Sequence, residues 1–455
     1  MPCFWCFEWV RRDSFDGVVV SIRANLVPRS GGRGCRLSRV LSLFTVLAGV
    51  IAGTTLGAHS SIAGSDSGGH NGNGLSAEAN AVKVEGALSQ AIFEIALSRG
   101  VTAEVFTLAN PYRVIIDLPD VTFHLPAGTG TRGEGLINRF RYGLFAERKA
   151  RVVIDTKGPV KITSATMAHG ATAGSVVLRV AMAETDAKSF ADGTGATRRD
   201  ETEAKAGASD EVPAKKGART KPVIVIDPGH GGIDPGASGI NNIYEKALVL
   251  AVAQRLQAVL SKSGAFDVRL TRTSDVFVSL DRRLKFSAEQ GADLFVSLHA
   301  DSIAETNLAE GIRGATVYTL SERASDEQAR KMAEKENASD LIAGLQGVDQ
   351  DGKDQVKNIL IDLMKRETSN FSADFSNVLV SRLKRSITLA RDPQRSAAFK
   401  VLKQTHAPSV LVELGYMSNS KDQQDMATPA WQEKVSGSIA AAVTAYFAKR
   451  TAGHP

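Results

Sequence analysis

Residues 223–239 read VIVIDPGHGGIDPGASG. A continuous apolar run that ends in prolines and glycines predicts a buried strand followed by a tight loop. Further strand-like segments, among them DLFVSLHA (293–300) and SVLVELGY (409–416), alternate with helix-like segments. The alternation predicts an α/β domain over residues 222–448, with a central, mostly parallel sheet flanked by helices.

The composition is that of an ordinary soluble protein with more than one domain. The chain has 455 residues, of which 43% are hydrophobic and 23% are charged. Its formal charge is +6, but residues 1–58 hold seven arginines and three acidic residues. The remainder is therefore near +2, which gives no reason to expect nucleic acid as a partner.

Residues 1–58 have the layout of a secretory signal peptide. Arg33, Arg36 and Arg39 precede the apolar run VLSLFTVLAGVIAGTTLGA (40–58), with small residues suited to cleavage after Ala52 or Ala58. The alternative is an uncleaved membrane anchor, although the run is short for one. We also expect the true start to lie downstream, so that residues 1 to about 30 are not made. All three cysteines lie in this part, so the exported, periplasmic chain has no thiol.

Composition divides the rest of the chain ahead of the α/β domain. Residues 59–80 are small, polar and glycine-rich, which predicts a flexible tether. Short runs of alternating apolar and polar residues over 81–184 predict a small all-β sandwich. Residues 185–221 have almost no large apolar side chains, which predicts a flexible linker.

Ionisable residues stand at or just beyond the ends of three apolar strands of the predicted α/β domain. They are His230, His299 and Glu413. In open α/β sheets the ligand crevice lies outside the carboxyl ends of the strands, so neighbouring strands bring such groups together. A buried carboxylate such as that of Glu413 costs several kcal/mol unless it is paired or functional.

Glu245 is a fourth candidate, because it begins the helix that follows the glycine loop. Two imidazoles and one carboxylate are a common catalytic zinc set, which leaves Glu413 as general base and acid. Taken singly, each residue has a plainer explanation: His230 in a turn, His299 in a hydrogen-bonded core, Glu245 at a helix start. Their conjunction favours the metal site.

These segments together resemble the zinc-dependent N-acetylmuramoyl-L-alanine amidases of the bacterial cell-separation type. The resemblance rests on IVIDPGHGGIDPGASG, Glu245, LTRTSDVFVSLDRR, ADLFVSLHAD and PSVLVELGYMSN. It implies that His230, Glu245 and His299 bind Zn²⁺ and that Glu413 is the catalytic glutamate. It also implies hydrolysis of the amide between N-acetylmuramic acid and L-alanine in peptidoglycan, for daughter-cell separation.

The β region is similar to the AMIN domain, through LANPYRVIIDLPD and INRFRYGLFAERKARVVIDTKGPV. That similarity implies peptidoglycan binding and enrichment at the division septum. An ordinary sandwich without a wall-binding role is the alternative. The family also implies a periplasmic coiled-coil activator with a degenerate metallopeptidase domain, and we expect the enzyme to be a monomer.

A helical insert at about 325–385 is implied by the resemblance to cover the zinc site until the activator displaces it. Glu336 is the candidate for the glutamate that contacts the metal, and Glu334 is the second choice, although charged helices usually carry solvated glutamates. Two alternatives to the amidase stay open. One is a non-catalytic wall-binding scaffold, and the other is a zinc peptidase that cuts within the stem peptide.

Overall fold

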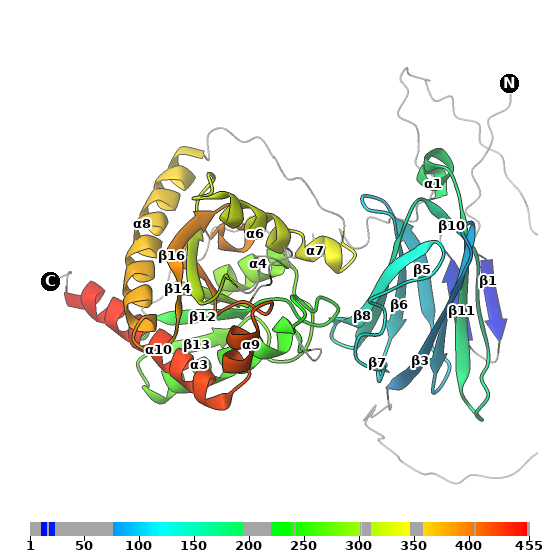
Figure 1. Cartoon of the computed structure of the whole chain (residues 1–455), viewed down its shortest axis with the longest axis horizontal. Coiled ribbons are helices and arrows are strands. Elements are labelled where there is room, and N and C mark those ends of the chain that lie inside the picture. The colour runs from blue at the N-terminus through cyan, green and yellow to red at the C-terminus, as the bar shows by residue number, and fades with distance from the viewer. Residues whose placement is uncertain are drawn as a thin grey trace, which may run out of the picture.

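The structure is a computed structural model, which describes residues 11–15, 18–22, 76–193, 220–239, 243–300, 302, 311–345, 358–404 and 406–452. Two domains are visible in Figure 1, a β-sandwich and an α/β domain. Among the described residues, no helix combines the length and the apolar character needed to cross a bilayer.

The first domain is a sandwich of two sheets, as the alternating pattern predicts. One sheet has the order β1-β2-β5-β6-β9-β8 and the other β10-β11-β4-β3-β7. Their inner faces enclose one apolar core, to which Phe93 on β4 and Ile154 on β9 belong. The strands of the first sheet are β1 (Arg11–Phe15), β2 (Val18–Ile22), β5 (Ala103–Leu108), β6 (Arg113–Pro119), β8 (Ile137–Ala146) and β9 (Lys149–Thr156). Those of the second are β3 (Ala77–Gly86), β4 (Gln90–Leu97), β7 (Val121–Phe123), β10 (Val160–His169) and β11 (Val176–Glu184).

Two strands fall inside the predicted signal region. β2 pairs with β5 in parallel, with Val20 opposite Ala103. The predicted cleavage sites after Ala52 and Ala58 lie outside the described residues. Signal cleavage therefore stays a prediction.

The predicted linker begins with ordered structure. A short helix, α1 (Ala187–Gly193), follows β11. Phe190 on this helix is buried and meets the ring of Tyr112 edge-on, with the ring centroids 4.8 Å apart. One aromatic side chain thus fastens the first residues of the predicted linker to the sandwich. Residues 194–219 lie outside the described part of the chain.

The second domain is built on a six-stranded sheet of order β13-β12-β14-β17-β15-β16. β12, β13, β14 and β17 run in parallel, whereas β15 is antiparallel to β17 and parallel to β16. The prediction of a mostly parallel sheet is confirmed. The strands are β12 (Val223–Pro228), β13 (Asp267–Leu270), β14 (Leu294–His299), β15 (Ala315–Leu320), β16 (Leu389–Ala397) and β17 (Ser409–Glu413).

Helices cover both faces of this sheet (Figure 1). One core joins the sheet to α3 (Glu245–Lys262), α8 (Asn358–Leu383), α9 (Ser420–Met426) and α10 (Pro429–Ala452). The other joins it to α4 (Leu280–Gln290), α6 (Glu327–Asn337) and the 3₁₀ turn η2 (Lys400–Leu402). A single turn, α7 (Ser339–Ile342), follows α6.

The predicted insert of about 325–385 differs in extent from what the structure shows. Phe375, Leu379 and Leu383 of α8 are fully buried in the core of the domain. The second half of α8 is therefore part of the α/β fold itself. The segment beside the predicted metal site consists of α6 and α7.

Candidate metal centre

The ends of three neighbouring strands build the site. β12, β14 and β17 are adjacent and parallel, so their carboxyl ends share one edge of the sheet. His299 and Glu413 lie opposite each other in the register of β14 and β17, and His230 follows β12 by two residues. All three side chains are buried. The structure thus brings together the three residues that the strand pattern singled out.

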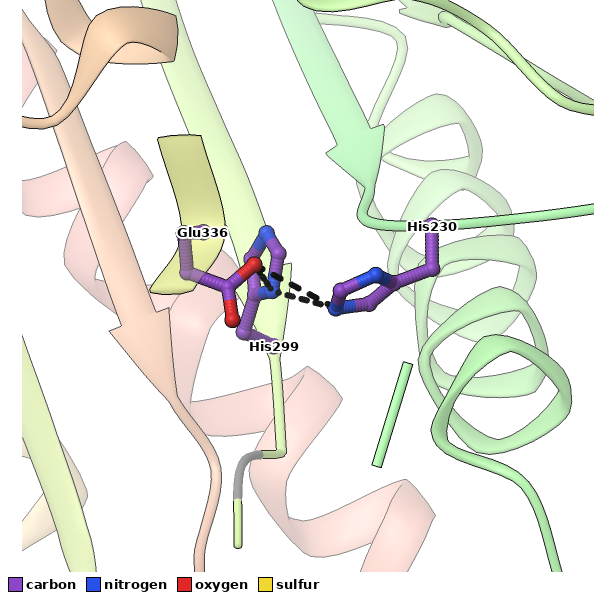
Figure 2. Close-up of side chains that lie close together, drawn as sticks. All are labelled: His230, His299 and Glu336. Atoms are coloured by element: carbon purple, nitrogen blue, oxygen red, sulfur yellow. Dashed lines mark hydrogen bonds and ion pairs between the residues drawn. The ribbon is translucent and has the colours of Figure 1, made fainter. Parts of the chain in front are cut away.

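Two imidazoles and two carboxylates converge there. His230 Nε2 and His299 Nδ1 are 3.1 Å apart. Glu245 Oε1 lies 3.1 Å from the first nitrogen and 3.2 Å from the second. Glu336 Oε2 lies 3.3 Å and 3.1 Å from the same two atoms. Dashed lines in Figure 2 join the Glu336 carboxylate to both imidazoles. The predicted ligand Glu245 and the insert residue Glu336 therefore both face the two histidines.

The spacing of these donor atoms fits zinc. A tetrahedral zinc ion about 2.0–2.1 Å from each ligand sets neighbouring ligand atoms roughly 3.3 Å apart. The five distances between donors are all close to that value. The ligand atoms of His230, His299 and Glu336 all lie within 4.8 Å of one another. Glu336 Oε1 is buried and has no hydrogen-bond partner within the described part of the chain.

Glycines allow the two imidazoles to approach the loop. A Cβ on Gly229 would lie 2.4 Å from two ring atoms of His299. A Cβ on Gly236 would lie 2.6 Å from the ring of His230 and 2.7 Å from Glu245 Oε2. His230 itself has a φ of 56°, a left-handed conformation that is uncommon outside glycine. The loop sequence is therefore fitted closely around the two rings.

Asp234 orients the His230 ring. His230 Nδ1 lies 2.8 Å from Asp234 Oδ2, which leaves Nε2 to face the cluster. The same carboxylate oxygen accepts a hydrogen bond of 2.5 Å from the hydroxyl of Ser339 on α7. A carboxylate behind a ligating histidine fixes the orientation and raises the basicity of the ring. Sequence reasoning missed this residue, although it stands four positions after His230 in the quoted loop.

A buried ion pair holds the loop from behind. Asp227 at the end of β12 accepts hydrogen bonds from Arg283 of α4, from Thr271 and from Ser297. Arg283 also donates to the carbonyls of Pro228 and His230, over 2.9 Å and 2.8 Å. One guanidinium therefore ties the strand end to the loop that carries His230. Sequence reasoning missed Arg283 as well.

Burial and charge act against each other in this cluster. Burial lowers the pKa of His299, but the charge of Glu336 and hydrogen bonds with Glu245 and Glu336 outweigh it and raise the pKa to about 10. Burial raises the pKa of Glu413 to about 8, with the charges of Glu245 and Glu336 acting in the same direction and that of His299 opposing. The carboxylates thus favour positive charge at the imidazoles. A divalent cation bound between the imidazoles would supply that positive charge instead and would release the protons from the two rings.

Glu334 and His406 lie away from the cluster. Glu334, the second choice for the metal-contacting glutamate, has a side chain 60% exposed and pairs with Arg330. His406 precedes β17 and lies near Ser287, with its Nε2 3.3 Å from that hydroxyl. Of the two insert glutamates, only Glu336 lies at the histidines.

Comparison with known proteins gives two family matches. Residues 224–445 match the model described as N-acetylmuramoyl-L-alanine amidase, and residues 81–178 match the AMIN domain. The chain is 32% identical over 379 residues to the N-acetylmuramoyl-L-alanine amidase AmiC of Escherichia coli, a match that covers 81% of this chain and 89% of the relative. It is 37% identical over 236 residues to AmiA of Salmonella typhimurium, which covers 52% of this chain and 79% of that relative. The solved catalytic domain of the amidase CwlV from Bacillus (Paenibacillus) polymyxa matches 50% of this chain and 98% of its own at 27% identity, with a TM-score of 0.33.

Proposed function

The chain belongs to the N-acetylmuramoyl-L-alanine amidases, and we propose that it hydrolyses the amide between the lactyl group of N-acetylmuramic acid and L-alanine in peptidoglycan. The observation that carries the proposal is the convergence of His230, His299 and Glu245 beside Glu413. We further propose a periplasmic enzyme, exported through residues 1–58, whose AMIN domain holds it at the wall and enriches it at the septum.

His230, His299 and Glu245 would hold zinc. When bound, zinc polarises a carbonyl group and makes water more acidic. The protein positions these donors through Asp234 behind His230 and through the backbone amides of Ala237 and Ala300, each of which donates to Glu245 over 2.8 Å. These contacts fix the donors before substrate binds.

Glu413 is the proposed proton carrier. It takes a proton from the water that attacks the lactyl carbonyl carbon, and it gives that proton to the alanine nitrogen as the carbon–nitrogen bond breaks. The products are a free carboxylate on the lactyl group and the amino group of the stem peptide. Burial raises the pKa of Glu413, which is the direction that favours a protonated carboxyl for the second transfer.

Mass spectrometry of digested sacculi tests the reaction. The zinc-loaded Glu336→Ala protein, or the zinc-loaded wild type with its activator, is expected to release intact stem peptides that begin with L-alanine. Fragments cut within the stem would instead indicate a zinc peptidase. A folded, zinc-loaded protein that releases nothing from labelled wall, even with an activator, would indicate a wall-binding scaffold.

We also propose that α6 keeps the enzyme inactive until an activator, a periplasmic coiled-coil protein with a degenerate metallopeptidase domain, displaces it. The support is Glu336, whose carboxylate occupies a position beside both histidines where substrate or water would have to bind. Glu336→Ala is expected to raise basal hydrolysis of sacculi. Glu334→Ala on the same helix is the matched control, because that side chain is exposed. Equal basal rates for Glu336→Ala and the wild type would contradict the proposal.

A further inference from the structure

The β-sandwich contacts the segment that carries Glu336. Two of its arginines donate to backbone carbonyls at the end of α7 and in the turn after it. Arg113 Nη1 lies 2.5 Å from the carbonyl of Leu341, and Arg151 Nη1 lies 3.2 Å from that of Ala343 and 3.5 Å from that of Gly344. The last carbonyls of a helix have no partner within it, so they accept such donors readily.

Both arginines are built into the sandwich. Their exposed fractions are 1% for Arg113 and 0% for Arg151. Asp117 accepts two hydrogen bonds from Arg151, of 2.6 Å and 2.9 Å, and the guanidinium stacks on the ring of Phe145 at 3.6 Å. Arg113 donates to the carbonyls of Pro111 and Ala109 in the same domain, over 3.1 Å and 3.4 Å. Contacts within the sandwich therefore orient both donors, so little side-chain freedom is lost when they meet α7.

An apolar contact surrounds these hydrogen bonds. Ala343 is fully buried in a cluster that Ile115 and Val153 of the sandwich share with Ile233 and Phe277 of the α/β domain. The next residue, Gly344, has a φ of +79°. A Cβ there would lie 2.8 Å from Ile115 Cδ1 and 3.2 Å from Val153 Cγ2. The turn therefore fits against the sandwich only as glycine.

A second contact joins the sandwich to the loop that carries His230. The carbonyl of Leu144 on β8 accepts hydrogen bonds from the amides of Ile233 and Phe277, over 3.2 Å and 3.3 Å. The β domain thus contacts both sides of the metal centre: the loop of His230 and the segment of Glu336.

We propose that the β domain is an intramolecular clamp, which holds residues 339–345 against the α/β domain and so keeps Glu336 in the metal centre. Only two residues separate Glu336 from Ser339, so α6 cannot leave the site unless α7 also moves. The regulatory consequence rests on the proposed autoinhibition by Glu336. It follows that displacement of the β domain loosens residues 339–345 and, with them, the helix that carries Glu336. Binding of the wall or of an activator to the β domain would then act on catalysis through Arg113 and Arg151.

The α/β domain holds the same segment by its own contacts. Asp340 accepts from the amide of Leu280 over 2.9 Å, and the Asn337 side chain bonds the backbone of Ala398 and Lys400. Loss of one clamp contact is therefore expected to shift the opening equilibrium rather than to free the segment. For a buried hydrogen bond from a charged donor, that shift is roughly tenfold.

Two variants weaken the clamp from opposite sides in the full chain. Arg113→Gln removes the donor to Leu341, and its control Arg139→Gln removes an arginine of the same domain that is 57% exposed and paired with Asp155. Gly344→Leu leaves the sandwich sequence intact and forces the turn away from Ile115. Its control is Gly264→Leu, at a φ of +68° with no atom within 4 Å of the added Cβ.

Hydrogen exchange of residues 327–345 decides the clamp. Exchange roughly tenfold faster in both Arg113→Gln and Gly344→Leu than in their controls is expected. Exchange equal to the controls in either variant overturns the inference. Basal hydrolysis of sacculi is measured alongside, with Glu336→Ala as the released reference. If exchange is faster in the clamp variants but Glu336→Ala hydrolyses sacculi no faster than the wild type, the clamp is supported and autoinhibition is refuted. Failure of the clamp and failure of autoinhibition are therefore distinguishable.

Discussion

Arg283→Met tests how the loop of His230 is held. Arg283 is 2% exposed and is the cationic partner of Asp227, which is fully buried. Removing one partner of a buried pair leaves the other charge uncompensated and typically costs about 3–5 kcal/mol. For a domain of this size each kcal/mol lowers Tm by about 2–4 °C, so the expected fall in Tm is roughly 6–20 °C.

The neighbouring arginine provides the control. Arg282 is 51% exposed and pairs with Glu289 on the surface of the same helix. Exposed pairs contribute about 0–1 kcal/mol, so Arg282→Met should change Tm by at most a few degrees. Thermal and urea unfolding, followed by circular dichroism on the metal-free proteins, gives both values.

The double variant Asp227→Asn with Arg283→Met separates charge from packing. If the loss arises from an uncompensated carboxylate, the double variant should recover part of the stability that Arg283→Met loses. A free-energy loss below about 1 kcal/mol for Arg283→Met, or one equal to that of Arg282→Met, would refute the reasoning.

Three further predictions concern the same site. Asp234→Ala should weaken zinc binding about 10–100-fold in a competitive chelator titration, because the His230 ring loses its orienting carboxylate; an affinity equal to that of Asp267→Ala, an exposed control, would contradict this. The stability of Asp227→Asn should depend less steeply on pH in acid than that of the wild type. Burial raises the pKa of Asp227, but Arg283 and the hydroxyl donors outweigh burial and keep the folded pKa below 3.8. The carboxylate therefore stabilises the fold above about pH 4, and this stabilisation is lost as the pH falls through the folded pKa. Identical pH profiles of unfolding for the two proteins would exclude this role. Glu413→Gln should lower kcat by at least about 10²-fold without lowering zinc content, and an equal loss of zinc would instead assign Glu413 to metal binding.

The strand ends of the site could be predicted from local patterns. Buried parallel strands appear in the sequence as continuous apolar runs, so the ionisable residues that end them stand out, as His230, His299 and Glu413 do. These residues meet because their strands, β12, β14 and β17, are neighbours in the sheet. Glu245 was also evident, because a helix start follows the glycine loop.

The supporting residues were harder to predict, for two different reasons. Arg283 stands in a helix in which five of the 11 residues are charged, and only the spacing of the buried positions Leu280, Arg283 and Ser287 distinguishes it from Arg282. A helical-face count could have found it. Ser339 bonds Asp234 across 105 residues of sequence, and no local pattern predicts such a contact.

The boundary between the two domains shows where composition misleads. A stretch at 185–221 that is rich in Ala, Gly, Lys and acidic residues predicts a flexible linker between the two domains. A linker's composition reports only the chain between two domains, however, whereas their faces determine whether they dock. Arg113 and Arg151 look like ordinary strand arginines in sequence, and their partners at Leu341 and Ala343 lie 228 and 192 residues away. A sequence that predicts a flexible linker therefore does not exclude docking, and Arg113 and Arg151 contact the segment beside the metal centre.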